Sequence, residues 1–178
     1  MQTGGLHAII CGMDISSLIA ELDNPNSVER RRARIELIQL QAAAVPALTG
    51  LLTDPRQRVR WEAAKALEVI DDPSTAPAFI KALEDEDAGI RWLAAEALGR
   101  MGAIGLRLLL SKLISDTGSG WLREGAHHAL HFYNGMLSPQ LEQLLRALED
   151  KTNAESVPWA AGIALQSLEQ PDPHTLSA

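Results

Sequence analysis

The sequence predicts an all-α protein in which pairs of helices stack as a solenoid. The first observation is an internal repeat: DPRQRVRWEAAKAL at residues 54–67 returns as DEDAGIRWLAAEAL at residues 85–98, an offset of 31 at each matched position. A fixed period of this size is typical of proteins whose units bury a face against their neighbours. The second observation is composition, because Ala and Leu dominate the hydrophobic residues and aromatic residues are only 4% of the chain. Such a composition favours closely packed helices.

Helix start and stop signals divide the chain into five pairs of a short and a longer helix. Asp14 is the expected N-cap of the first helix, and Asn24-Pro25-Asn26 ends that helix. Pro46, Pro77 and Pro139 each lie at the start of a short first helix, where proline removes a donor that has no partner. The five repeats are expected approximately at residues 14–40, 45–70, 74–100, 103–134 and 138–169 of a single domain.

The two ends of the chain lack this periodicity. Residues 1–13 are expected to be a flexible extension, and residues 170–178 a disordered tail with two prolines. The apolar segment LHAIICGM, residues 6–13, is too short to span a bilayer and lacks the basic start of a secretory signal. Cys11 is the only cysteine, so an intrachain disulfide is excluded and a cytoplasmic location is expected.

The charge of the chain argues against binding to nucleic acid. The formal net charge is −7, whereas binding to phosphate backbones depends on a surplus of Lys and Arg. The exception is the cluster of Arg30, Arg31, Arg32 and Arg34, which spreads around its helix instead of forming one stripe. Solvation of the first repeat explains this cluster better than a nucleic-acid site does, and contact with an acidic partner stays open.

The repeated turn and helix carry a family resemblance. An Asp-Pro turn followed by Val-Arg, Ala-Ala and Leu at helical spacing, as in Asp54, Val59, Arg60, Ala63 and Leu67, resembles HEAT repeats. The short type found in phycobilisome lyase subunits is the most similar. The resemblance implies a right-handed, armadillo-type superhelix whose second helices line a concave surface, and it admits a heterodimer with a second HEAT-like subunit.

A helical wheel predicts which residues of the second helices face outward. Residues on one side form the buried stripe, namely Val59, Ala63, Ala66, Leu67 and Ile70. The opposite side holds Trp61, Ala64, Lys65 and Glu68. The same positions across the repeats define an expected binding surface of Trp61, Lys65, Glu68, Trp92, Glu96, Glu124, His127, His128, His131 and Trp159.

Three tryptophans share one row of this outward side: Trp61, Trp92 and Trp159. An exposed indole is a frequent anchor in protein interfaces because it offers a large area at little entropic cost. The alternative is that each indole lies flat across the next helix and fills space between repeats. The sequence leaves both readings open.

The repeated Asp and Arg residues are expected to be structural. Asp54, Asp85, Asp116 and Asp150 occupy the turns, and Arg60, Arg91 and Arg123 begin the helices that follow. An Asp that accepts from backbone amides and from the Arg of a neighbouring repeat would join the stack.

The fourth second helix contains the strongest chemical motif. His127 and His131 are four residues apart, as are Glu124 and His128, so all four side chains project from one side of the helix. An i, i+4 His pair can chelate Zn²⁺, with Glu124 as a third ligand. A solvated polar patch is the simpler reading. HEAT-like deoxyhypusine hydroxylases carry His-Glu dipeptides, and this chain contains none.

The leading prediction is therefore a non-catalytic protein-interaction scaffold that uses the concave face and needs no cofactor. The first alternative follows the family resemblance and is a bilin lyase, which attaches chromophore to phycobiliprotein, or a subunit related to one. The second alternative is a metal-binding HEAT protein that uses His127, His128 and His131. Nucleophilic catalysis is not expected, since the single cysteine has no periodic partner and no Ser lies in a recognisable elbow.

Overall fold

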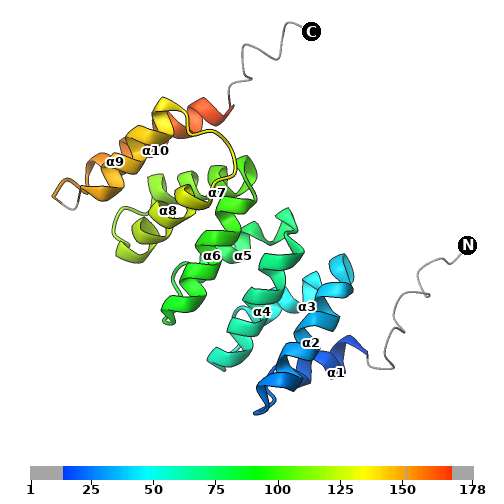
Figure 1. The fold of residues 1–178 in the computed structure, drawn as a ribbon. Coiled ribbons are helices and arrows are strands. Elements are labelled where there is room, and N and C mark those ends of the chain that lie inside the picture. The colour runs from blue at the N-terminus through cyan, green and yellow to red at the C-terminus, as the bar shows by residue number, and fades with distance from the viewer. Residues whose placement is uncertain (1–13, 151, 170–178) are drawn as a thin grey trace, which may run out of the picture. The chain divides into compact units, whose positions relative to one another are not determined.

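The computed structural model describes residues 14–150 and 152–169, which form ten α-helices and two short 3₁₀ helices without any strand. Figure 1 shows the helices in chain order from blue to red. The α-helices are α1 (Ile15–Glu21), α2 (Ser27–Gln39), α3 (Val45–Leu51), α4 (Gln57–Ile70), α5 (Ala76–Ala82), α6 (Ala88–Arg100), α7 (Ala103–Ser115), α8 (Gly120–Phe132), α9 (Pro139–Glu149) and α10 (Ser156–Glu169). The 3₁₀ helices, Gln41–Ala43 and Pro73–Thr75, precede α3 and α5.

The helices alternate as first and second members of five pairs, so the predicted all-α solenoid fold is confirmed. The predictions for residues 1–13 and 170–178 lie outside the described residues. Among the described residues, no helix combines the length and apolar character needed to cross a membrane. The chain divides between Ala78 and Phe79 into two compact units, which are described separately below.

In the first unit, α1 to α4 pack around leucines that are completely buried. The Asp14 carboxylate accepts a hydrogen bond from the Ser17 amide at 2.7 Å, which confirms the predicted N-cap of α1. The side chain of Asn26 accepts from the Val28 amide at 3.0 Å and caps α2. Local capping thus fixes where both helices begin, and the buried leucines hold α2 against α4.

A buried carboxylate joins α2 to α4. Glu62 is buried, accepts from Arg30 Nε at 3.2 Å and also forms an ion pair with Arg34. Because both arginines are largely covered, the charges compensate one another away from bulk water. At the turn end of the same helices, Arg56 Nη1 lies 3.1 Å from Asp23 Oδ2 and forms a second, exposed link between the first two repeats.

The repeated Asp and Arg residues organise the turns. Asp54 Oδ1 accepts from the Arg56 amide at 2.9 Å, and Asp85 Oδ1 accepts from the Asp87 amide at 2.8 Å, so the predicted bonds to backbone amides are confirmed. Arg60 donates to the carbonyl of Asp54 at 3.0 Å, and Arg91 donates to the carbonyl of Asp85 at 2.8 Å. Each guanidinium therefore holds the turn of its own repeat.

In the second unit, α6 packs against α8, whereas α10 packs mainly against α7 and α9. The contact of α6 with α8 is unusually close at Gly99. A Cβ atom there would lie 2.3 Å from the carbonyl oxygen of Ala129 and 2.9 Å from Phe132 Cβ. Only glycine fits at this crossing, because any side chain would overlap the backbone of α8.

One part of the predicted outward face is wrong. Ala64 and Glu68 are buried, as are Ala95 and Gly99 at the matching positions of α6. A helical wheel assumes a single buried face, but a helix inside a stack has neighbours on more than one side. The contact of Gly99 with α8 shows this directly for the second unit. The outward face is consequently narrower than the sequence predicts.

Candidate functional site

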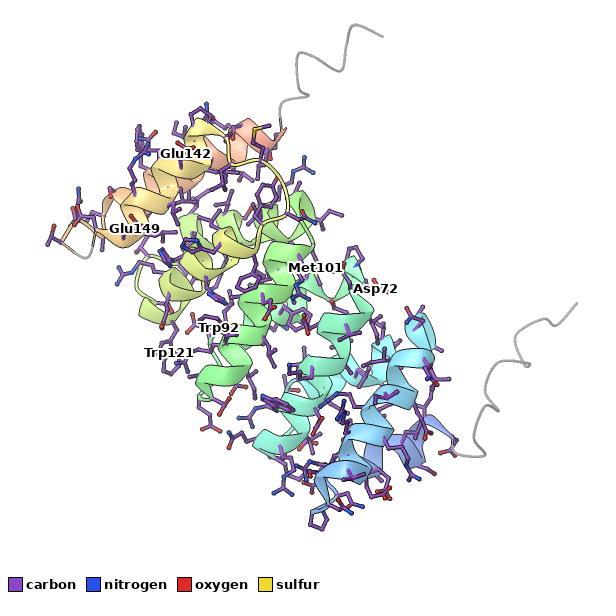
Figure 2. All side chains as sticks on the ribbon, in the orientation of Figure 1. Asp72, Trp92, Met101, Trp121, Glu142 and Glu149 are labelled. Atoms are coloured by element: carbon purple, nitrogen blue, oxygen red, sulfur yellow. The ribbon has the colours of Figure 1, made fainter. Side chains whose placement is uncertain are left out.

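Aromatic side chains of α6 and α8 form a cluster on the second unit. The cluster comprises Trp92, Trp121, His128 and Phe132, and we call it the aromatic cluster. The centroids of the Trp92 and His128 rings lie 3.3 Å apart with an interplanar angle of 41°. Phe132 lies 4.7 Å from His128 and 6.4 Å from Trp92, centroid to centroid. Figure 2 labels the two indoles, Trp92 and Trp121, which both line one cavity.

The local sequence explains why these side chains meet. Residues 121, 128 and 132 lie on one side of α8, since they are seven and four residues apart. The start of α8 is fixed by Ser119, whose hydroxyl oxygen accepts from the Leu122 amide at 3.0 Å and donates to Glu84 Oε1 at 2.5 Å. Gly125 lets α8 approach Leu83, because a Cβ atom there would lie 2.7 Å from Leu83 Cδ2.

Arg91 completes one wall of the cluster. Its guanidinium carbon lies 4.5 Å from the centroid of the Trp121 ring, within the range of a cation–π interaction. The same guanidinium donates to the carbonyls of Asp85 and Glu86, at 2.8 and 3.1 Å. Trp121 is therefore packed against a side chain that is itself fixed by the turn.

The aromatic cluster borders a cavity of about 220 Å³. The lining residues are Ala88, Arg91, Trp92, Ala95, Trp121, Glu124, Gly125, His127 and His128. Within the described part of the chain, the buried Nε2 atom of His128 has no hydrogen-bond partner. The cavity thus combines apolar ring surface with the polar side chains of Arg91, Glu124 and His127.

Burial lowers the pKa of His128 below its ordinary value of 6.5. The neighbouring carboxylates of Glu96 and Glu124 act in the opposite direction, while His131 and His127 add to the lowering. His128 is therefore neutral at pH 7 and packs on Trp92 as an uncharged ring.

A second and larger cavity, of about 710 Å³, lies between α8 and the turn that joins α9 to α10. Glu124 and His127 line both cavities. His127 Nε2 lies 3.7 Å from Glu149 Oε1, which also borders the larger cavity. Arg123 lines it too, and forms no ion pair among the described residues. The larger cavity occurs where α10 does not pack along α8.

The structure does not assemble the predicted metal site of Glu124, His127 and His131. The two imidazoles are close, with 3.4 Å between their Nε2 atoms. Within residues 14–150 and 152–169, however, no group of three or more His, Cys, Asp or Glu side chains is placed to hold a metal ion. Glu124 lines both cavities, as His127 does.

The tryptophans and charged residues of the predicted surface have different environments. Trp92 and Trp159 are exposed, as one of the two readings requires, whereas Trp61 is half-buried in the first unit. Glu96 forms an ion pair with Arg100 at 2.5 Å. Trp159 stands apart from the aromatic cluster because α10 packs mainly against α7 and α9.

Two residues of the cluster, Trp121 and Phe132, are absent from the surface predicted from sequence. The signal was available: Trp121 is seven residues before His128, and Phe132 is four residues after it, so both share its side of the helix. Neither residue occupies the position that matches Trp61, which is Glu124 in the fourth repeat.

The paired helices and the repeated geometry of their turns define a class, the all-α repeat proteins. Within this class the chain belongs to the HEAT-repeat family, whose model matches residues 15–79 and 65–131. A chain in the solved complex of CpcE and CpcF of phycocyanin lyase from Nostoc sp. PCC7120 is similar to this protein, with a TM-score of 0.59 and 24% identity. The alignment covers 84% of this chain and 96% of that chain, and it shows a shared fold. A comparison with curated proteins finds no match.

Proposed function

We propose that this protein is a non-catalytic protein-interaction module that binds its partner through the aromatic cluster. The observation that carries the proposal is the exposure of two indoles on a fixed pair of helices, 54% for Trp92 and 44% for Trp121. Exposed tryptophans held by packed secondary structure lose little entropy on binding, and they are enriched among the residues that dominate interface energy.

The size of the adjoining cavity supports a protein partner. Small-molecule sites usually measure about 300–1,000 Å³, whereas the cavity beside the two indoles measures about 220 Å³. That volume suits one side chain of a partner. Arg91, Glu124 and His127 in the cavity wall would supply polar contacts beside the apolar ring surface.

The partner in this proposal is a second HEAT-like subunit. Support comes from the solved structure with the same fold, which is a complex of two proteins, CpcE and CpcF. The proposal includes a cytoplasmic location, in keeping with the single cysteine of the sequence.

The experiment is affinity capture by the full-length protein, followed by quantitative mass spectrometry. We expect Trp92→Ala and Trp121→Ala each to reduce the recovered partner about tenfold or more, because central tryptophans in interfaces contribute about 2 kcal/mol or more. Ile104→Ala is the matched control, since Ile104 is an exposed apolar residue on the first helix α7. Circular dichroism checks that all variants stay folded. Equal recovery by the tryptophan variants and the control would refute the proposal.

A second candidate is a bilin lyase or a lyase-related subunit. It is favoured by the larger cavity, whose volume of about 710 Å³ falls within the range of ligand sites and whose wall includes Arg123. An arginine could pair with a carboxylate of a tetrapyrrole. Absorbance spectra recorded on mixing the protein with a bilin test this function. This function is eliminated if the bilin spectrum stays unchanged on mixing with the unmodified protein and also on mixing with the Arg123→Ala variant.

A further inference from the structure

The outward faces of α2 and α4 in the first unit are formed by corresponding positions of the repeat, which lie 30 residues apart in the chain. On α2 these residues are Val28, Arg31, Ile35 and Gln39, and on α4 they are Arg58, Trp61, Lys65 and Val69. The two helices pack against each other, and none of the eight residues is buried. We call these eight positions the basic face.

The basic face has positive charge in a protein that is acidic overall. Three of its eight residues are Arg or Lys and none is Asp or Glu, whereas the whole chain has 16 basic and 23 acidic residues. The nearby Glu62 carboxylate is buried and already engaged by Arg30 and Arg34. Among the described residues, Arg31 and Lys65 form no ion pair. Arg58 Nη1 lies 4.0 Å from the Asp23 carboxylate and donates a long hydrogen bond, of 3.5 Å, to the carbonyl of the same residue.

Apolar side chains lie between these charges. Val28 is 68% exposed and Ile35 is 43% exposed. Two cations lie near the Trp61 ring, with Arg34 Cζ at 5.6 Å and Lys65 Nζ at 5.5 Å from its centroid. These cation–π contacts hold the indole in place and keep positive charge beside an apolar surface.

From this pattern we infer that the basic face binds an acidic protein segment that also presents apolar side chains. Carboxylates of the segment pair with Arg31, Arg58 and Lys65, and its apolar side chains cover Val28, Ile35 and Trp61. The inference rests on the proposed function, because it names the chemistry of a partner for an interaction module. Charge complementarity selects the acidic segment, and the exposed apolar residues select a protein.

Nucleic acid fits this face less well. Proteins that bind nucleic acid through phosphates typically make about 6–10 such contacts, whereas the basic face has three cations in a chain of net charge −7. Phosphates would also leave Val28 and Ile35 uncovered. The second unit differs again, because the matching positions of α6 and α8 include the acidic residues Glu96 and Glu124.

The test is fluorescence anisotropy with three labelled probes and the full-length protein. The probes are a peptide in which pairs of Glu alternate with pairs of Leu, the same peptide with Gln in place of each Glu, and a single-stranded oligonucleotide of similar length. We expect the Glu peptide to bind about tenfold or more tightly than the Gln peptide, and to weaken as salt increases. The double variant Arg31→Glu with Lys65→Glu should lose about tenfold or more in affinity for the Glu peptide. Arg146→Glu, an exposed charge reversal on α9, should bind as the unmodified protein does.

Three results would overturn the inference: equal affinity for the Glu and Gln peptides, unchanged binding by the double variant, or tighter binding of the oligonucleotide than of the Glu peptide. Affinity capture separates this failure from failure of the proposed function. If Trp92→Ala loses the partner while the Arg31→Glu, Lys65→Glu variant keeps it, the proposed function stands and the inference is wrong. If neither variant loses the partner, the proposed function fails as well.

Discussion

Substitution of Gly99 by Ala tests the packing that positions the aromatic cluster. Gly99 lies on α6 where that helix crosses α8, and the added Cβ would lie 2.3 Å from the carbonyl oxygen of Ala129. Carbon and carbonyl oxygen atoms in close contact are usually about 3.3–3.6 Å apart. The two helices must therefore separate by roughly 1 Å, since the obstacle is backbone and not the end of a flexible side chain.

The expected cost follows from two opposing contributions. Overpacking in a close-packed interior destabilises by about 1–3 kcal/mol, and a clash with backbone belongs at the upper end of that range. Replacement of Gly by Ala within a helix offsets about 1 kcal/mol, because alanine has the higher helix propensity. The net loss of stability is about 2 kcal/mol, which for a chain of this length corresponds to a Tm lower by about 4–8 °C.

Urea and thermal unfolding, followed by circular dichroism, measure this loss. Gly162→Ala in α10 is the matched control, because nothing lies within 4 Å of the position where its Cβ would be. We expect this control to be unchanged or more stable by up to about 1 kcal/mol. The Gly99 variant should also show altered tryptophan fluorescence, since Trp92 lies on the helix that moves and packs on His128 of the other helix.

The reasoning is refuted if Gly99→Ala is as stable as Gly162→Ala and leaves the fluorescence spectrum unchanged. That outcome would mean that α6 and α8 are further apart than the structure places them. If stability falls but the spectrum does not change, the close approach at Gly99 is correct, and the expected effect of helix separation on the environment of Trp92 is wrong.

Two further predictions concern ionisable groups that are buried or half-buried. Glu62→Gln should destabilise the protein by about 2–3 kcal/mol in urea unfolding, because it leaves two largely covered arginines without their carboxylate. The control Glu29→Gln removes a half-exposed carboxylate and should cost less than about 1 kcal/mol. Equal effects of the two substitutions would contradict the burial of Glu62. The pKa of His128 is lowered in the folded protein, so the unfolded chain takes up a proton first and stability should fall as pH decreases below 6.5. The free energy of unfolding, measured at several values from about pH 7.5 to about pH 5.5, should decrease less for His128→Asn than for the unmodified protein. An identical pH dependence of the two proteins would disprove the assignment of this decrease to His128.

The sequence is sufficient for the fold because its signals repeat. Asp14 lies at the start of α1, Pro139 begins α9, and Val59, Ala63 and Leu67 are all buried, as local capping and helical periodicity predict. These features depend on each residue's immediate neighbours in the chain and on one buried stripe. They can be read without knowing how the repeats pack.

The candidate site is less predictable because it depends on contacts between helices. The sequence places Glu68 on the outward face, but the structure buries its side chain. It also suggests three metal ligands from their spacing on one helix, yet among the described residues no group of three His, Cys, Asp or Glu side chains is placed to hold a metal ion. Spacing along a helix determines which side chains share a face, whereas distances across helices determine which atoms meet.

The break in the repeat period explains where the cavities form. Residues 54–67 recur after 31 positions, but Leu122, Ala126 and Leu130 are matched by Val157, Ala161 and Leu165, which lie 35 positions further on. The additional residues mainly lengthen the connection between α8 and α9, which spans residues 133–138, whereas the connection between α6 and α7 spans residues 101–102. In this part of the chain α10 packs mainly against α7 and α9 instead of along α8. In a regular stack, the next second helix would cover one side of α8. Here that side stays open, so His131 is exposed and a cavity of about 710 Å³ lies beside His127. In a regular stack, each repeat buries its faces against its neighbours. A partner can therefore bury the most surface where the period changes and a face stays uncovered.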